Sequence, residues 1–267
     1  MVMIDSGERV VVVTGAAAGI GAAVAAALAS DAGAISLWDR DPRVHDVARE
    51  ISAGTKASVT AVEVDVTDRS AVADAFDKLV AEHGPADVVV HAAGIMLAGT
   101  GLDTTPEDWE RSLAVNATGT MHVTQRAAND MVAAGGGAIV VVSSNAASTP
   151  RVGMAAYCAS KAAATAFTRA LALQVAPHGV RVNLVSPGST DTPMLRGMFA
   201  DGDQPLDEAS HTALLDGDPT AYRLGIPLRR IAAPADIAAA VRFLVSDDAR
   251  HITLHDLRVD GGATLDM

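Results

Sequence analysis

The chain has 267 residues, with 32 acidic and 20 basic side chains and a formal net charge of −12. This length allows one large domain with a full core, and an acidic chain without a basic stripe excludes nucleic acid as an expected partner. A single cysteine, Cys158, excludes an internal disulfide and fits the reducing cytoplasm. The first ten residues lack the basic region and apolar core of a signal peptide, and no apolar run approaches the length of a membrane span.

The first expected strand, residues 10–13, leads into a glycine-rich turn at 14–21 and an alanine-rich helix that runs to about residue 32. A strand, a glycine-rich turn and a helix in this order are typical of a phosphate site. Gly15 permits the tight turn, Gly19 lets the backbone approach a pyrophosphate, and Gly21 lets the helix pack on the strand. The N–H groups at the helix N-terminus then favour the phosphates. A glycine turn that serves only packing is the alternative.

Carboxylates follow the second and third expected strands, residues 34–38 and 57–64. Asp39 lies roughly twenty residues past the glycines, where a carboxylate binds the adenosine ribose 2′-OH of NAD and repels the 2′-phosphate of NADP. Arg40 would favour a phosphate, but the position of Asp39 matches the ribose, so we expect NAD. An Asp that caps a helix or turn before Pro42 is the alternative. Asp65 and Val66 either flank an adenine or form a turn.

Strands and helices then alternate to the end of the chain. Further strands are expected at 87–90, 138–142, 180–185 and 254–259, and helices at 67–83, 106–134, around Tyr157 to about 176, and 234–246. This order predicts one α/β domain over residues 1–267, a doubly wound, Rossmann-like parallel sheet of about seven strands in the order 3-2-1-4-5-6-7 with helices on both faces. Ligands should bind outside the carboxyl ends of the strands.

Residues 192–223 differ from the rest of the chain. They are rich in Asp, Gly and Pro and carry only scattered apolar side chains. An irregular segment after the carboxyl end of a strand is suited to cover a bound ligand. We therefore predict that this segment, called the insert below, forms a lid over the substrate.

A hydroxyl, a phenol and an ammonium are expected to meet after the fifth main strand. Ser144 ends that strand, while Tyr157 and Lys161 are four residues apart and share one face of an alanine-rich helix. A neighbouring cation favours the phenolate and lowers the tyrosine pKa, and the serine can hold an oxygen on which charge develops. The set suits proton transfer to or from an alcohol or carbonyl oxygen. A chance Tyr–Lys spacing on an amphipathic helix is the alternative.

These motifs, with Asn116 and Pro187-Gly188, occur in an order and spacing that resemble the short-chain dehydrogenase/reductase family over nearly the whole chain. The resemblance implies that Tyr157 is the acid/base, that Ser144 orients the reacting oxygen, and that Lys161 lowers the tyrosine pKa and binds the nicotinamide ribose. Asn116 would hold a water in a proton relay to Lys161. The resemblance also implies a homotetramer and further contacts to the NAD cofactor from Ile20, Ala92, Gly94, Pro187, Gly188, Thr190 and Thr192.

Residues 148–154, 186–192, 224–228 and 251–262 are similar to members of that family that oxidise 2,3-dihydro-2,3-dihydroxybenzoate to a catechol acid for siderophores. Arg151 would then pair with the substrate carboxylate through its bidentate fork, or be a surface or subunit-contact residue. Met154 and Met194 are candidate apolar walls, although methionine is often only packing. His91 replaces the asparagine usual in the family, and we interpret it as a strand-end residue that causes a local rearrangement without loss of binding.

Three other functions remain open from the sequence. A dehydrogenase for a dihydro-hydroxyanthranilate would use the same chemistry on a ring that carries an amine in place of one hydroxyl. A ketoreductase of the family would normally prefer NADPH, which Asp39 disfavours. A nucleotide-binding regulator without turnover is disfavoured by the intact set of Asn116, Ser144, Tyr157 and Lys161. We expect no metal site.

Overall fold

A computed structural model describes residues 9–199 and 202–265 of the chain. The expectations for residues 1–8, which include most of the segment compared with a signal peptide, and for residues 200–201 of the insert and 266–267 lie outside the described residues. Among the helices of the described ranges, none is both long and apolar enough to cross a membrane.

The centre of the structure is a parallel sheet of seven strands in the order β3-β2-β1-β4-β5-β6-β9. This confirms the predicted topology, with β9 as the seventh strand of the main sheet. The strand order reverses between β1 and β4, so a crevice opens there beyond the carboxyl ends. The strands are β1 Val10–Thr14, β2 Ala34–Asp39, β3 Ser58–Glu63, β4 Val88–His91, β5 Gly137–Val142, β6 Val180–Pro187 and β9 Asp256–Val259.

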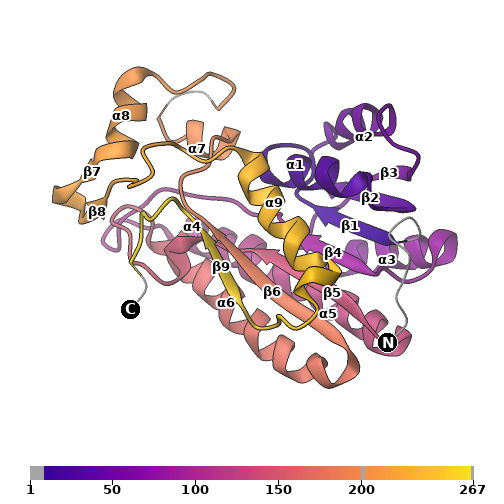
Figure 1. The fold of residues 1–267 in the computed structure, drawn as a ribbon. Helices are drawn as coiled ribbons and strands as arrows, with labels where there is room; N and C mark the ends of the chain where they lie inside the picture. Colours follow the sequence, from indigo (N-terminus) through magenta and orange to yellow (C-terminus); the bar gives the residue numbers. More distant parts are fainter. Residues whose placement is uncertain (1–8, 200–201, 266–267) are drawn as a thin grey trace.

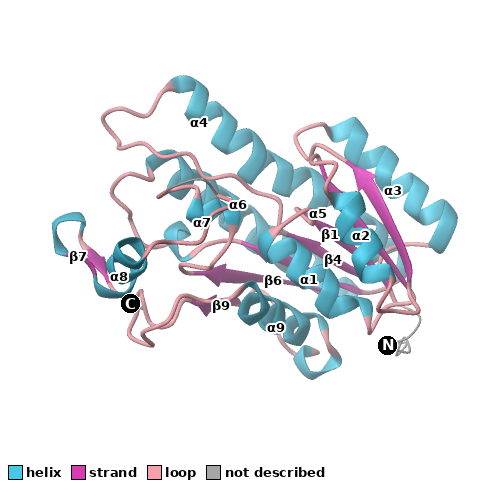
Figure 2. Ribbon diagram, turned by 90° about the horizontal axis from the view of Figure 1, so that it is seen from above, coloured by secondary structure: helices cyan, strands magenta, loops and turns pink. Residues whose placement is uncertain are grey.

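Helices cover both faces of the sheet, as Figures 1 and 2 show. Successive strand residues point to opposite faces, so Val11 and Val13 pack in one core and Val10 and Val12 in the other. The first core lies under α1 Gly19–Ala29, α2 Val44–Ser52 and α9 Pro234–Val245, and the second lies under α3 Arg69–His83, α5 Gly119–Ala134 and α6 Ala155–Val175. Short 3-10 turns follow α6 and α9 at Ala176–His178 and Asp247–Ala249.

The expected long helix 106–134 is interrupted at its centre. It consists of α4 Pro106–Leu113, a π-helical segment Ala114–Thr118, and α5. Asn116 is the middle residue of this wider turn, and its side chain bonds both the N–H and the C=O of Ile95 at 2.9 Å. Such π segments are frequent at functional sites, and this one ties the helix to the loop after β4.

The insert is more regular than its composition suggests. It contains α7 Pro193–Arg196, α8 Glu208–Asp216 and β7 Gly217–Asp218. A 3-10 turn at Pro219–Ala221 joins β7 to β8 Arg223–Leu224, which completes a small hairpin at the end of the insert. The two helices begin where Thr192 and Asp207 accept hydrogen bonds from backbone N–H groups, which is the role of N-cap residues. Figure 1 shows these elements gathered at one end of the molecule, beyond β6.

Candidate active site

Two clefts open at the carboxyl ends of the strands and share five lining residues, Ile20, Ala92, Gly94, Thr192 and Met194. The first, of about 230 Å³, is also lined by the glycine-rich turn, Asp39, Asp65 and Val66. The second, of about 150 Å³, is also lined by Ser144, Arg151, Met154, Tyr157, Lys161, Pro187, Gly188 and Thr190. The fold therefore brings together almost every candidate residue. Asn116 lines neither cleft and lies buried behind Gly94.

The glycine-rich turn has the backbone conformation that its sequence predicts. Gly15 and Gly19 have positive φ angles of 69° and 56°, which favour glycine. A Cβ at Gly21 would collide with the carbonyl of Gly15, so only glycine lets α1 lie this close to the end of β1. Ala18 provides no side-chain cap for α1, and the helix therefore begins at the cleft without an internal acceptor for its first N–H groups.

Asp39 and Asp65 both accept hydrogen bonds within turns, while the cofactor contact of each residue stays a prediction. The Asp39 carboxylate accepts hydrogen bonds at 3.0 Å from the N–H groups of Ala17 and Asp41, so it both forms a turn and holds the glycine-rich turn in place. Asp65 accepts from the N–H and hydroxyl of Thr67 at 2.9 and 2.8 Å. Both carboxylates also line the first cleft.

Ser144, Tyr157 and Lys161 are buried together where β5 ends and α6 begins. The Ser144 hydroxyl accepts from the N–H of Ala146 at 3.1 Å, within a 3-10 turn at Asn145–Ala147, and hydrogen-bonds the phenol of Tyr157. The Lys161 ammonium donates to the Val142 carbonyl at 2.9 Å. The fold thus brings the serine hydroxyl, the phenol and the ammonium together on one wall of the second cleft.

The pKa of Tyr157 differs from the sequence-based expectation. Burial raises it, and the hydrogen bond from Ser144 is the contact that lowers it. Burial also lowers the pKa of the Lys161 ammonium, which donates to the Val142 carbonyl, to about 8. In the protein alone, therefore, desolvation outweighs the effect of the Ser144 hydrogen bond, and the phenol is neutral at pH 7.

Asn116 is fully buried and braces the site. Its amide donates to the Ile95 carbonyl and to the Ser160 hydroxyl, both at 2.9 Å, and Ser160 donates to the Tyr157 carbonyl at 2.8 Å. A Cβ on Gly94 would lie 3.1 Å from the Asn116 Oδ1 and 3.3 Å from the Lys161 Nζ. Glycine at this position leaves open the space between these two groups. The relay through a water stays a prediction.

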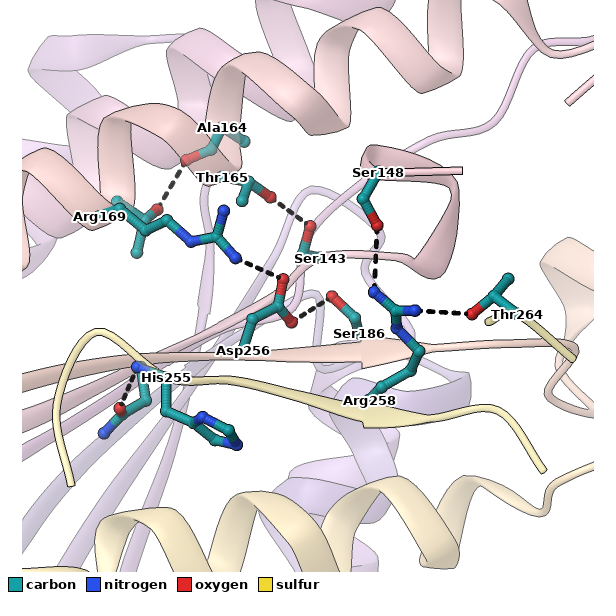
Figure 3. Close-up of polar contacts among 12 residues, drawn as sticks. Ser143, Ser148, Ala164, Thr165, Arg169, Ser186, His255, Asp256, Arg258 and Thr264 are labelled. Carbon is teal, nitrogen blue, oxygen red and sulfur yellow. Dashed lines mark hydrogen bonds and ion pairs between the residues drawn. The ribbon is translucent and has the colours of Figure 1, made fainter. Parts of the chain in front are cut away.

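The C-terminal part of the chain holds the loop that follows Ser144. Asp260 accepts hydrogen bonds from Asn145 at 3.2 Å and from Thr264 at 2.6 Å. Arg258 donates to Ser148 at 3.2 Å and to Thr264 at 3.0 Å, as Figure 3 shows. These contacts fix the loop from its far side, although the sequence gives no local sign of them.

The second cleft also contains residues that the sequence did not single out. The candidate substrate residues Arg151 and Met154 line it from the loop before α6, and Met194 lines it from the insert. Arg223, Met198 and Leu214 of the insert line it as well, and so do Leu224 and Ile226, which follow the insert. The insert thus forms one wall of this cleft. No regular spacing marks these residues, and only their place in a segment predicted to cover a ligand could have suggested them.

His91 is buried in the sheet with only one of its ring nitrogens bonded. Nδ1 shares a hydrogen bond of 2.9 Å with the Thr14 hydroxyl, which also accepts from the N–H of Ala93 at 3.2 Å. Nε2 has no partner among the described residues. Burial, and secondarily the charge of Lys161, lowers the pKa of His91 to about 3, so the ring is neutral at pH 7. His91 therefore links the ends of β1 and β4 beneath the cleft.

Comparison with known families and structures gives a consistent result. Residues 15–264 match the family described as "Enoyl-(Acyl carrier protein) reductase". The structure is similar to that of a short-chain type dehydrogenase/reductase from Mycobacterium marinum, with 32% identity, a TM-score of 0.86 and 98% of each chain covered. It is also similar to 7 alpha-hydroxysteroid dehydrogenase complexed with NADH and 7-oxo glycochenodeoxycholic acid, with 27% identity, a TM-score of 0.85 and 99% of each chain covered.

Curated relatives are similar over nearly the whole chain. The sequence is 41% identical to 2,3-dihydro-2,3-dihydroxybenzoate dehydrogenase of Bacillus subtilis, with 96% of each chain covered. It is 39% identical to the enzyme of the same name from Escherichia coli, with 98% of this chain and 99% of the relative covered. It is 38% identical to cis-4-hydroxycyclohexanecarboxylate dehydrogenase of Sinomonas cyclohexanicum, with 96% of this chain and 97% of the relative covered.

The burial of His91 predicts a specific dependence of stability on pH. Its pKa is about 3 in the folded protein against an ordinary value of 6.5, so between these values the unfolded chain binds the proton and the folded protein does not. Stability contributed by the neutral ring is therefore present above pH 6.5 and decreases on acidification, by up to about 1.4 kcal/mol per pH unit. In urea unfolding at pH 7, 6 and 5, the wild type should lose stability more steeply than His91→Asn.

The exposed His178 provides the control, because His178→Asn should follow the wild type at every pH. Parallel curves for the wild type and His91→Asn would contradict a buried, neutral His91.

Proposed function

Because the chain belongs to the short-chain dehydrogenase/reductase family and is an oxidoreductase of that family, we propose that it oxidises 2,3-dihydro-2,3-dihydroxybenzoate to 2,3-dihydroxybenzoate with NAD⁺. The observation that carries the proposal is the buried set of Ser144, Tyr157 and Lys161 on the wall of the second cleft, which shares five lining residues with the first. The substrate is supported by relatives of that name at 41% and 39% identity.

The residues of the first cleft fit a dinucleotide. The glycine-rich turn and the N-terminus of α1 would hold the pyrophosphate, and the carboxylate of Asp39 would bind the adenosine ribose. Asp65 and Val66 would border the adenine, and the open space over Gly94 would admit the nicotinamide ribose next to Lys161. Ile20, Ala92, Pro187, Gly188, Thr190 and Thr192 would surround the nicotinamide end of the cofactor.

The chain's own residues would manage the proton and the reacting oxygen. Tyr157, as the phenolate, takes the proton from a ring hydroxyl, and the Ser144 hydroxyl holds that oxygen as it becomes a carbonyl. A bound NAD⁺ would supply the acceptor for the hydride of the same ring carbon. The resulting cyclohexadienone loses a proton from the neighbouring ring carbon and gains one on oxygen, which gives the catechol. Aromaticity makes the overall step effectively irreversible.

Lys161 and Asn116 would support this chemistry. One N–H of the Lys161 ammonium is used by Val142, and two remain to bind the ribose and, with the oxidised nicotinamide's own charge, to favour the phenolate. This addition is needed because burial alone raises the pKa of Tyr157. Asn116 joins α6 to the loop after β4 through its hydrogen bonds to Ser160 and Ile95. A water beside it would connect Lys161 to solvent.

The second cleft fits a small ring that carries a carboxylate. Met154 and Met194 form apolar walls, and the half-buried Arg151 offers a fork for the acid group. Both 2,3-dihydro-2,3-dihydroxybenzoate and cis-4-hydroxycyclohexanecarboxylate, named in the relatives, place a hydroxyl and a carboxylate on a six-membered ring. The product would enter the assembly of a catechol siderophore.

The proposed setting is a homotetramer in the cytoplasm, with the insert as a lid over the substrate. Leu173 on α6 is 65% exposed and Phe243 on α9 is 43% exposed, which supports the use of these helices in subunit contacts. The single cysteine supports a reducing compartment.

The substrate is tested by a direct assay. With NAD⁺, 2,3-dihydro-2,3-dihydroxybenzoate should give the absorbance of a catechol acid together with an equal amount of NADH, whereas the amino analogue, a dihydro-3-hydroxyanthranilate, should react more slowly. Faster aromatisation of the amino analogue, or reaction of neither compound, would contradict the proposed substrate.

The role of the phenol is tested by Tyr157→Phe, which keeps the ring and removes the hydroxyl. Turnover should decrease by a factor of about 100 to 10,000, the usual contribution of acid–base catalysis, while NAD⁺ affinity measured by fluorescence stays nearly unchanged. Tyr222→Phe is the matched control, since Tyr222 is the chain's other tyrosine and is 88% exposed. A Tyr157→Phe enzyme with the wild-type rate would show that the mechanism is wrong.

Asp39 should determine the choice of cofactor. Asp39→Asn keeps an oxygen acceptor for the Ala17 N–H but removes the charge that repels a 2′-phosphate. The ratio of kcat/KM for NAD⁺ to that for NADP⁺ should decrease by about tenfold or more. Asp46→Asn, on the exposed side of α2, removes the same charge and should leave the ratio unchanged. An unchanged ratio in Asp39→Asn would assign NAD selectivity elsewhere.

A further inference from the structure

Among the described residues of the insert, Arg223 is the one charged side chain that lines the second cleft. We propose that Arg223 and Arg151 together form a two-cation site that holds the carboxylate of the ring substrate. The inference rests on the proposed function in that it concerns the same cleft, but it can be tested without turnover. It makes Arg223 a residue that determines substrate specificity.

The two arginines reach the cleft from different segments. Arg151 belongs to the loop between Ser144 and Tyr157, and Arg223 begins β8 in the hairpin of the insert. Both are partly buried, and they lie near enough for the charge of Arg223, after burial itself, to lower the pKa of Arg151. Two like charges are therefore held beside one cavity, an arrangement that an anion would stabilise.

Neither guanidinium makes a hydrogen bond or an ion pair with another described residue. Other arginines of the insert and of the loop after it are paired. Arg196 contacts Asp191 at 2.7 Å, Arg229 contacts Asp216 at 2.7 Å, and Arg230 contacts Asp236 at 2.6 Å. These three arginines, which do not line the second cleft, are paired with carboxylates, whereas the two arginines that line it have no such partner among the described residues.

The acidic groups that face the two arginines are already hydrogen-bonded to other groups. Asp218 lies opposite Arg223 in the hairpin, and its carboxylate accepts from Thr220 and Ala221. Asp260 acts on Arg151 through its charge, and its carboxylate accepts from Asn145, Gly262 and Thr264. These two carboxylates offset part of the positive charge, so the remaining field suits a monoanion such as a carboxylate better than a dianion.

The apolar lining of the cleft indicates what the carboxylate is attached to. Met154, Met194, Leu214 and Ile226 line the same cleft as the two arginines and the reactive hydroxyls. A flat six-membered ring with its acid group on the arginines would present its far side to Ser144 and Tyr157. In this way the two cations would select which ring hydroxyl is oxidised.

The experiment compares benzoate with benzamide, which has the same shape but no charge. Binding of each is measured by calorimetry to the protein saturated with NAD⁺. The wild type should bind benzoate at least about tenfold more tightly than benzamide. Arg223→Gln and Arg151→Gln should each reduce this ratio severalfold, and the double variant should lose less than the product of the two single effects, because both groups hold one carboxylate.

Two further variants make the result specific. Arg223→Lys retains the charge and should keep most of the selectivity, which shows that the loss in Arg223→Gln is not a failure to fold. Arg229→Gln removes a paired arginine of the same region that does not line the cleft, and its ratio should match the wild type. An unchanged ratio in Arg223→Gln, or equal binding of benzoate and benzamide by the wild type, would overturn the two-cation site.

The outcome is independent of the proposed substrate. If the protein fails to oxidise the dihydrodiol but prefers benzoate in a manner that depends on Arg223, the proposed substrate is wrong and the two-cation site stands. If it oxidises the dihydrodiol and Arg223→Gln leaves both the KM and the benzoate ratio unchanged, the proposed function stands and the role of Arg223 is wrong.

Discussion

The site depends on the buried ammonium of Lys161 and its bond of 2.9 Å to the carbonyl of Val142. A buried cation is costly, and burial lowers its pKa to about 8. The bond fixes α6 against the end of β5, so the phenol of Tyr157 is placed against the hydroxyl of Ser144. Burial of two such groups would only destabilise a helix with a structural role. Here it makes the pKa values of Lys161 and Tyr157 sensitive to any charge that enters the cleft.

The topology of the sheet explains why two clefts adjoin at the carboxyl ends of the strands. Parallel strands end at one edge, and the reversal of order between β1 and β4 opens the edge at its centre. The glycine-rich turn and Asp39 then border one side of the opening, while the ends of β5 and β6 and the insert border the other. The binding of a dinucleotide and of a small ring at adjoining places therefore follows from the same strand order.

The features that could be predicted from the sequence are local ones. The conformation of Gly15 and Gly19, the end of β2 at Asp39 and the shared helix face of Tyr157 and Lys161 follow from short-range spacing. Other features depend on contacts between distant segments. The π segment at Asn116 is coupled to the loop after β4, and the pKa of Tyr157 depends on how deeply the fold buries it. Arg223 enters the cleft only because a short hairpin, which no pattern in the insert marks, turns it inward.

The central claim is that the phenol of residue 157 faces the nicotinamide where the two clefts meet. A crystal structure of the protein with NAD⁺ and benzoate tests it most directly. We expect the nicotinamide ring between Gly94 and Thr192, with the benzoate ring between it and the Tyr157 hydroxyl. A nicotinamide ring far from that hydroxyl, or a dinucleotide bound away from the glycine-rich turn, would contradict it.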